Sequence, residues 1–125
     1  MNDKYVLDSA GNPIPEPDLL TWGRWFEESG ELRRVACTNL DVNGTVSTIF
    51  LGIDHSWCFL SDPLLYTPVL WETMVFGGPM DEEMQRYSSR EEALAGHQDV
   101  VAQVKAKAAE EQDAILKTLE KEERT

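Results

Sequence analysis

The sequence predicts an α+β fold with an N-terminal helix, an antiparallel β-sheet of about four strands, and a long C-terminal helix or helical hairpin. Runs rich in β-branched and aromatic residues occupy the middle of the chain, and two of them flank Asn43-Gly44, a dipeptide typical of hairpin turns. Helical spacing of apolar residues occurs only before and after these runs. Because helices and strands do not alternate, and no Rossmann or P-loop glycine motif occurs, a parallel α/β fold is not supported.

The length of 125 residues suits one domain, with residues 1–17 as an arm, 18–88 as helix and sheet, and 89–125 as a helical region. The net charge is −12, from 23 acidic and 11 basic residues. A nucleic-acid binder presents a positive surface to phosphate groups, so we expect no direct binding of DNA or RNA. A nucleotide-sized anion remains a possible ligand, because it needs only a few local cations and backbone N–H groups. A basic protein is also a possible partner for a chain of this charge.

Cys37 and Cys58 lack the spacing of a zinc site, and we expect both to be buried, reduced thiols. We expect no metal and no cofactor. The N-terminal run MNDKYVLDSAG lacks the basic and apolar regions of a signal peptide. No apolar run approaches the roughly 18 residues of a membrane span, so we expect no membrane contact.

Prolines at positions 13, 15 and 17 cannot donate ladder hydrogen bonds, so we expect residues 1–17 to be an extended arm without regular pairing. A helix over residues 18–29 follows, with Asp18 as its N-cap and Gly30 after its end. Gly23 inside this helix costs roughly 1 kcal/mol against alanine, which suggests close packing there. The run LLTWGRWF, residues 19–26, suits an interface or a small core, and we favour the core.

Residues 33–53 predict a β-hairpin with a type I′ turn at Asn43-Gly44. Apolar residues fall on both alternating faces of its second strand, which predicts a central position in the sheet. A third strand is expected over residues 69–76, ended by Gly77-Gly78-Pro79, and a short fourth strand over 84–88. The apolar loop over residues 57–68 either folds onto the core or forms an interface.

The last helix is expected to begin at Ser88 or Ser89, each followed three residues later by a glutamate as in a capping box. No proline interrupts residues 90–125, and a helix of about 30 residues would be about 45 Å long. This length exceeds the radius of a compact domain. The helix must therefore bend back, project or pair with another chain. We expect its proximal part to pair with another copy as a homo-oligomer, with a charged end that frays after about residue 118. The alternative is a long solvated helix without a partner.

The first candidate site is a group of two histidines and two carboxylates: Asp54, His55, Glu72 and His97. Pairing of the strands over 44–53 and 69–76 would place His55 near Gly77-Gly78. A histidine beside a carboxylate can act as a general base or a metal ligand. No metal or hydrolase motif supports such chemistry, so we expect no enzyme activity, and we expect His97 to be a core histidine with satisfied hydrogen bonds.

The second candidate site is a ligand pocket at the start of the last helix, where free N–H groups and the helix dipole favour an anion. Glycines let the backbone approach a ligand, arginines hold phosphate, and aromatic side chains stack a base. The predicted ligand-binding residues are Arg86, Arg90, Tyr87, Gly77, Gly78, Phe76, Trp71 and His55. The alternative is structural: a Gly-Gly-Pro turn, a core tyrosine, and arginines paired with Glu82, Glu91 or Glu92 across the surface.

Three runs of the chain resemble a widespread group of small proteins, mostly of unknown function, that tailed phages and prophages encode. The shared core reads V-S-T-x-F-L-G-x-D-H over residues 46–55, E-T-M-V-F-G-G over 72–78, and R-Y-x-[ST]-x-x-E-A-x-x-G-H over 86–97. The N-terminal run is similar as well, so the resemblance spans residues 4 to about 104. It implies a phage protein that acts in the cytoplasm of an infected bacterial host.

A β-sheet followed by a long C-terminal helix is also similar to Thoeris anti-defence proteins of the sponge type. Those proteins bind cyclic ADP-ribose-like or cyclic-oligonucleotide signals without cleaving them. The resemblance implies that the predicted pocket sequesters a small nucleotide immune signal. The alternatives are an acidic inhibitor of a host nuclease or CRISPR effector, which the net charge of −12 favours, and a phage adaptor of another function.

Overall fold

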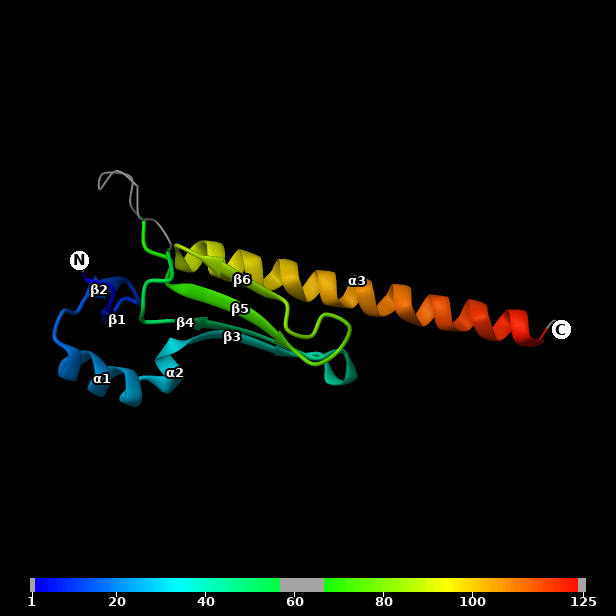
Figure 1. Ribbon diagram of the computed structural model, residues 1–125, viewed down its shortest axis with the longest axis horizontal. Coiled ribbons are helices and arrows are strands. Elements are labelled where there is room, and N and C mark those ends of the chain that lie inside the picture. The colour runs from blue at the N-terminus through cyan, green and yellow to red at the C-terminus, as the bar shows by residue number, and fades with distance from the viewer. Residues whose placement is uncertain (1, 57–66, 124–125) are drawn as a thin grey trace.

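The computed structural model describes residues 2–56 and 67–123, and it confirms the α+β fold class (Figure 1). A two-stranded and a four-stranded antiparallel sheet combine with a short N-terminal helical region and one long C-terminal helix. In chain order the elements are β1 (Tyr5–Leu7), β2 (Pro13–Pro15), α1 (Leu19–Glu28), α2 (Gly30–Arg33), β3 (Arg34–Asn39), η1 (Asp41–Asn43), β4 (Thr45–Phe50), β5 (Trp71–Phe76), β6 (Met84–Tyr87) and α3 (Arg90–Glu123).

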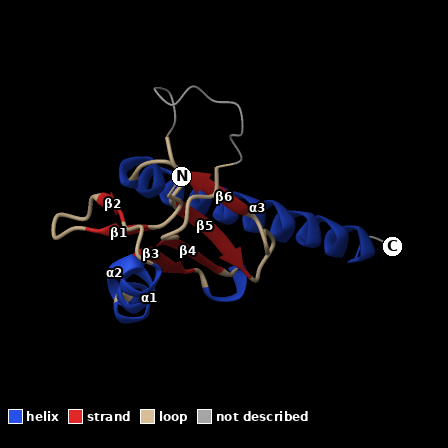
Figure 2. Cartoon of the chain, turned by 60° about the vertical axis from the view of Figure 1, so that its left-hand side comes forward, coloured by secondary structure: helices blue, strands red, loops and turns tan. Residues whose placement is uncertain are grey.

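The four-stranded sheet has the order β3-β4-β5-β6, and each strand pairs antiparallel with its neighbour along the chain (Figure 2). The predicted central position of β4 is confirmed, because β4 lies between β3 and β5. Alternate residues of β4 and β5 are buried beneath α3, whereas the residues between them are only partly buried. The sheet is therefore a layer with α3 across one face.

Cys37 lies on β3, an edge strand of this sheet, and it pairs with Ser47 on β4. The expectation of a buried thiol is wrong for Cys37, which is exposed. The reason is strand alternation, because its neighbour Thr38 points toward His97 of α3 and Cys37 therefore points to the opposite face. Cys58 lies outside the described residues, as does most of the apolar loop predicted over 57–68.

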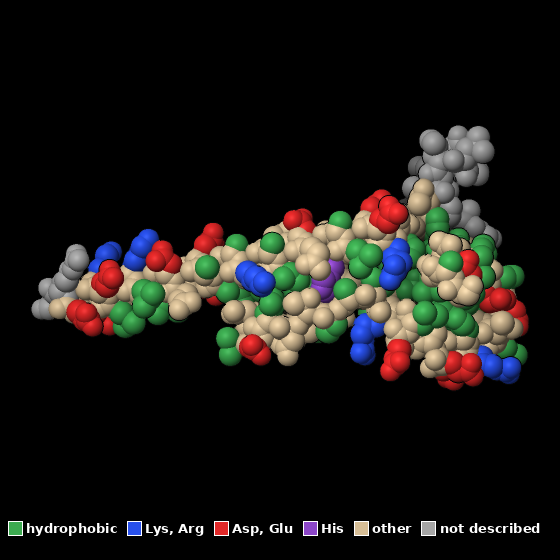
Figure 3. Space-filling view, turned by 180° about the vertical axis from the view of Figure 1, so that it is seen from behind, with side chains coloured by type: hydrophobic (Ala, Val, Ile, Leu, Met, Phe, Trp, Pro, Cys, Tyr) green, Lys and Arg blue, Asp and Glu red, His purple; other side chains and the backbone are tan. Residues whose placement is uncertain are grey.

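Helix α3 is a single helix rather than a helical hairpin, and it extends well past the sheet (Figures 1 and 3). Its 34 residues correspond to about 50 Å. Ser89 is the cap: its hydroxyl accepts a hydrogen bond from the N–H of Glu92 at 3.1 Å. The buried residues of α3 end at Val104, and the helix continues beyond residue 118, where the sequence predicts fraying. Within residues 2–56 and 67–123, no helix is both long and apolar enough to cross a membrane.

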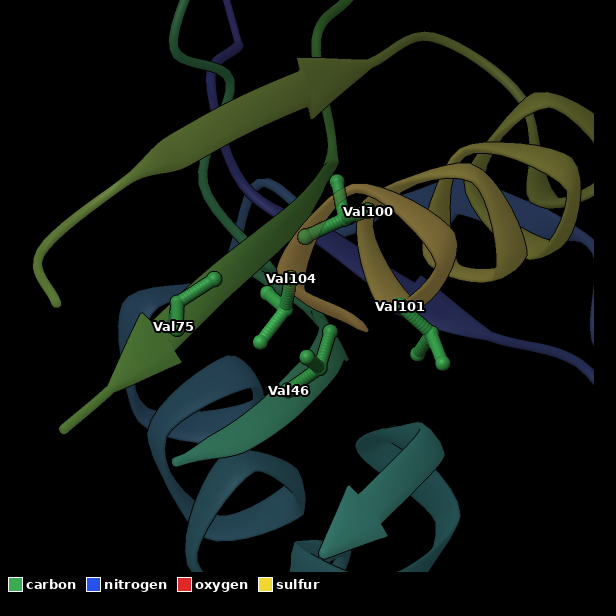
Figure 4. Close-up of a cluster of buried hydrophobic side chains, with 5 residues drawn as sticks. All are labelled: Val46, Val75, Val100, Val101 and Val104. Carbon is green, nitrogen blue, oxygen red and sulfur yellow. The ribbon is translucent and has the colours of Figure 1, made fainter. Parts of the chain in front are cut away.

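The core forms where the first half of α3 crosses the sheet. One cluster of buried valines comes from three elements: Val46 of β4, Val75 of β5, and Val100, Val101 and Val104 of α3 (Figure 4). A second buried cluster contains Phe50, Leu70, Trp71 and Ala93. Each large apolar side chain that is fully buried contributes roughly 1.5–3 kcal/mol, so these clusters hold α3 on the sheet.

The hairpin between β3 and β4 is confirmed, but its turn is longer than predicted. Asn39 pairs with Thr45, so five residues make the connection, and three of them form the 3₁₀ turn η1. The N–H of Leu40 donates to the carbonyl of Gly44 at 2.8 Å. A two-residue type I′ turn at Asn43-Gly44 would have paired Val42 with Thr45 and extended β3 by three residues. The observed turn instead packs against the turn after β5.

The two turns meet at their glycines. Gly44 and Gly78 both have positive φ, at +102° and +73°. A Cβ on Gly78 would lie 2.0 Å from the carbonyl oxygen of Asn43, and a Cβ on Gly44 would lie 2.4 Å from that of Gly77. Gly44 and Gly78 therefore allow backbone to pack directly on backbone.

The N-terminal arm forms strands, contrary to the prediction from its prolines. Tyr5 pairs with Pro15, and Leu7 pairs with Pro13. The flanking hydrogen bonds run from the N–H of Asp8 to the carbonyl of Asn12 and from the N–H of Glu16 to that of Lys4, both at 2.9 Å. Because ladder bonds alternate along an antiparallel pair, prolines at the intervening positions remove no donor that the pairing needs.

Helix α1 confirms the predicted N-cap, because the Asp18 carboxylate accepts from the N–H and the hydroxyl of Thr21. The indole N–H of Trp22 contacts the carbonyls of Tyr5 at 3.1 Å and Gly52 at 3.0 Å, which ties α1 to the arm and to the segment after β4. In the run over residues 19–26, which the sequence predicts to be part of the core, the three aromatic residues are partly buried. Both leucines of this run are exposed.

Gly78→Ala is expected to lower the free energy of unfolding by about 3 kcal/mol, because the new Cβ collides with the backbone of Asn43 and φ is left-handed. Gly11→Ala is the matched control: φ is +85° there, but nothing lies within 4 Å of the added Cβ. It should cost only about 1–2 kcal/mol. Urea denaturation measures both, and equal costs would contradict the tight contact between the turns.

Gly23→Ala is expected to stabilise the protein. No atom of the described residues lies within 4 Å of a Cβ added at Gly23, so none of them provides the close packing that the sequence suggests. Alanine in a helix interior is favoured over glycine by roughly 0.5–1 kcal/mol. A gain of this size should appear in the same denaturation measurement, and a loss of stability would contradict the open space beside Gly23.

Candidate functional site

A hollow of about 360 Å³ lies at the N-terminus of α3, and we call it the α3 hollow. Three segments form it: the turn between β1 and β2 with the first residue of β2, the first residue of β5, and residues 88–94, which comprise the link into α3 and the start of that helix. Its lining residues are Ala10, Gly11, Asn12, Pro13, Trp71, Ser88, Ser89, Arg90, Glu91 and Leu94. Its volume is within the range of small-molecule sites, at the lower end.

The start of α3 supplies donors and positive potential to the α3 hollow. The carbonyl of Ser89 accepts the first helical hydrogen bond, from the N–H of Ala93 at 3.0 Å. The N–H groups of Arg90 and Glu91 precede this bond and have no acceptor within the helix. Together with the helix dipole they favour an anion, although the carboxylate of Glu91 opposes it.

Arg90 is exposed at this helix start, and it forms no ion pair within residues 2–56 and 67–123. Its guanidinium group is therefore available to a ligand that carries phosphate or carboxylate, and it can donate two parallel hydrogen bonds to such a group.

Trp71 adds an independent sign of a ligand. Its side chain is 2% exposed, yet its indole Nε1 has no hydrogen-bond partner among the described residues. Buried polar groups are nearly always paired, so this donor, which is closed to solvent in a residue that lines the hollow, requires an explanation. An acceptor atom on a bound ligand would provide one.

The turn between β1 and β2 is held in shape on the opposite side of the hollow. The Asp8 carboxylate accepts from the N–H of Ala10 at 2.9 Å and from that of Asn12 at 2.8 Å. Gly11, with φ at +85°, donates to the carbonyl of Asp8 at 3.0 Å. The wall contributed by the arm is therefore organised before any ligand binds.

The structure brings only some of the predicted ligand-binding residues to this hollow. Arg90 and Trp71 line it. Arg86 lies on β6 and pairs at 3.1 Å with Glu72 of β5, which is none of the glutamates that the structural alternative named. Tyr87 packs in the core, where its ring would lie 2.3 Å from a Cβ on Gly96, and its hydroxyl has no partner among the described residues.

Phe76, Gly77 and Gly78 lie at the opposite end of β5 from Trp71. Five residue steps along a strand separate the two ends by roughly 17 Å. The double glycine therefore lies against the turn after β3 and not beside the start of α3.

His55 lies at the Trp71 end, and the expectation that it would be near Gly77-Gly78 is wrong. Antiparallel pairing places Phe50 opposite Trp71, and the N–H of His55 donates to the carbonyl of Val69 at 2.9 Å. The end of β4 therefore meets the beginning of β5.

The four residues of the first candidate site do not converge. The imidazole Nδ1 of His55 contacts the carbonyl of Ile53 at 2.7 Å. The carboxylate of Asp54 accepts from the N–H groups of Ser56 and Val69, both at 2.9 Å. Glu72 pairs with Arg86, and His97 lies in the core. Across the described part of the chain, no group of three or more His, Cys, Asp or Glu side chains could hold a metal ion.

His97 is fully buried, and threonine hydroxyl groups satisfy both of its ring nitrogens, as the sequence predicted for a core histidine. Its Nε2 lies 2.8 Å from the hydroxyl of Thr38 and its Nδ1 lies 2.7 Å from that of Thr48. Thr48 in turn lies 2.5 Å from the hydroxyl of Thr73. Hydroxyl groups can donate or accept, so this network accommodates a neutral imidazole in either tautomer.

Sequence reasoning did not identify the hollow's hairpin wall or the threonines around His97. The wall was missed because the prolines suggested an unpaired arm. Strand alternation did place Thr48 on the same face as Val46 and Phe50, and that was the available signal for a polar group facing α3.

No protein-family model, no curated protein and no solved structure matches this chain. The resemblance to phage proteins and to anti-defence sponges therefore stays a prediction.

The stability of the protein is expected to fall as the pH drops below about 6.5. Burial lowers the pKa of His97 below its ordinary value of 6.5. Between the two pKa values the unfolded chain binds the proton and the native protein does not, so acidification favours unfolding until the native imidazole also protonates. The slope can reach about 1.4 kcal/mol per pH unit.

Denaturant titrations of the wild type and of His97→Gln between pH 7.5 and 5 check this expectation. The variant should lack the histidine component and show a shallower slope. Identical slopes would show that His97 does not take up its proton on unfolding.

Proposed function

We propose that the protein binds a small anionic ligand of the nucleotide type in the α3 hollow and retains it without cleavage. The observation that carries the proposal is the coincidence of three groups around one hollow of about 360 Å³. These are the first N–H groups of α3, the guanidinium of Arg90, and the unpaired buried indole N–H of Trp71.

Each group has a role that suits such a ligand. The N–H groups of Arg90 and Glu91 and the guanidinium of Arg90 hold a phosphate at the helix start. Ser88 and Ser89 line the same wall. The indole N–H of Trp71 is closed to solvent, and a small shift of the ring would let it donate to a ligand oxygen or nitrogen. This arrangement concentrates positive potential locally in a protein of net charge −12.

The biological setting comes from the sequence resemblance. We propose that a phage or prophage encodes the protein and that it sequesters a cyclic nucleotide immune signal in the cytoplasm of the bacterial host. Sequestration of the signal requires high affinity and enough copies of the protein to bind it, and it requires no catalytic residue. The second candidate function, inhibition of a basic host nuclease or CRISPR effector, is supported by the excess of acidic residues.

Calorimetric titration of the full chain with cyclic ADP-ribose, a cyclic dinucleotide, AMP and inorganic phosphate tests the proposal. We expect at least one nucleotide to bind, and Arg90→Ala to weaken it at least tenfold by loss of a charge-assisted contact. Trp71→Phe keeps the aromatic ring but removes the donor, and it should also weaken binding. Arg24→Ala removes an exposed arginine of α1, outside the residues that line the hollow, and it should leave affinity unchanged.

Heating the complex and identifying the released compound separates capture from catalysis. Intact nucleotide supports capture, and a cleaved product would assign an enzyme instead. If none of the four compounds binds, the proposal of nucleotide capture is wrong. A basic host protein that is retained on the immobilised chain only at low salt would support the second candidate function, inhibition of a host protein.

A further inference from the structure

The projecting half of α3 carries an apolar stripe that nothing in the described structure covers. Ile115, Leu116 and Leu119 form this distal stripe, and they are 61%, 52% and 50% exposed. Ile115 and Leu119 are four residues apart, and Ile115 lies seven residues after Ala108 and fourteen after Val101. The distal stripe is therefore the continuation of the helix face that packs on the sheet, visible as green side chains on the underside of the projecting helix (Figure 3).

A groove marks the place where this helix face leaves the sheet. It has a volume of about 440 Å³ and lies between α3 and the turn η1. Val42 at the tip of η1 is 91% exposed, which is unusual for a valine beside a second apolar surface. The lining residues of this helix–turn groove are Val42, Asn43, Lys105, Ala108, Ala109, Glu111, Gln112 and Ile115.

We infer that a second copy of this chain covers the distal stripe, with the two α3 helices antiparallel and each helix end lying in the other copy's helix–turn groove. This inference does not rest on the proposed function, because the α3 hollow lies at the other end of the helix.

The small and large residues of the stripe are complementary in this arrangement. A two-fold axis beside residues 113 and 114 places Leu119 of each copy opposite Ala108 of the other, and Ile115 opposite Gln112. Leu119 then enters the groove next to Val42, where the small side chains of Ala108 and Ala109 leave room for it. The same patch is used on both copies, as a two-fold interface requires.

The charges of the projecting helix select the antiparallel orientation. The half of the projecting helix beside the sheet contains Lys105, Lys107, Glu110, Glu111 and Asp113, and the far half contains Lys117, Glu120, Lys121, Glu122 and Glu123. Antiparallel helices about the axis beside residues 113 and 114 place Lys105 level with Glu122, Lys107 level with Glu120, and Glu110 level with Lys117 of the other copy. Parallel helices would place like charges together, which opposes association.

A second copy also fits better than a membrane surface. The exposed side chains around the stripe are mainly acidic toward the end of the helix, and anionic lipid head groups would repel them. The overlap of residues 105–123 is about 28 Å long, so the dimer is expected to be of modest affinity and to dissociate on dilution.

Sedimentation equilibrium of the full chain over a wide concentration range tests the inference. The wild type should be a concentration-dependent dimer. Replacing Ile115 and Leu119 by glutamate should give a monomer with unchanged circular dichroism, because both side chains are exposed within one chain. Ala114→Glu adds a negative charge on a different side of the same helix and should stay dimeric. A wild type that is monomeric at every concentration would overturn the inference.

Cysteine cross-linking tests the orientation, in a chain whose Cys37 and Cys58 are replaced by serine. The pair Ala108→Cys and Leu119→Cys should oxidise to a covalent dimer, because these positions meet only between antiparallel copies. Within one helix they are about 16 Å apart, too far for a disulfide. Efficient cross-linking of Leu119→Cys alone would show parallel helices and overturn the antiparallel arrangement. Nucleotide binding by the Ile115→Glu, Leu119→Glu variant then reports on the proposed function separately.

Discussion

The packing of the first half of α3 across the sheet is the contact on which the rest of the structure depends. Buried valines from α3, β4 and β5 supply its apolar part. His97 supplies its polar part, because its two nitrogens contact hydroxyl groups from β3 and β4. A helix that slipped by one turn along the sheet would separate the buried imidazole from the hydroxyl groups of Thr38 and Thr48, at a cost of about 1–3 kcal/mol for each group left without a partner. The contact between Thr48 and Thr73 lies within the sheet and would remain. The network therefore fixes the position of α3 along its axis, whereas apolar contacts alone would tolerate some displacement.

This fixed position determines what lies at the two ends of the helix. At the N-terminal end, Ala93 and Trp71 belong to the same buried cluster, so the free N–H groups of the first turn are held beside the indole and the arm hairpin. At the C-terminal end, the sheet stops supporting α3 after Val104. An exposed apolar stripe follows because the helical sequence is longer than the sheet that it crosses.

The sequence was sufficient for the elements whose signals are local. Asp18 and Ser89 predict where α1 and α3 begin, and apolar residues on both faces of β4 predict its central position in the sheet. The turn after β3 was mispredicted because its length is set by contact with Gly77 and Gly78, which are distant in sequence. The same limit applies to the candidate site. The residue types suited an anion, but only the strand register shows that Arg90 and Trp71 share a hollow while Phe76 lies about 17 Å away.

The inferred dimer has a consequence for the α3 hollow that follows from helix geometry. Arg90 lies about 23 residues before the two-fold axis, which corresponds to about 35 Å along α3. The two hollows are then about 70 Å apart, at opposite ends of a rigid pair of helices, and each is built from residues of one chain. No side chain of one copy reaches the ligand of the other. Coupling between the hollows would require α3 to shift along the sheet, and the His97 network opposes such a shift. Two copies would therefore bind two ligands with equal affinity, and dimerisation would raise the number of sites per particle without altering either of them.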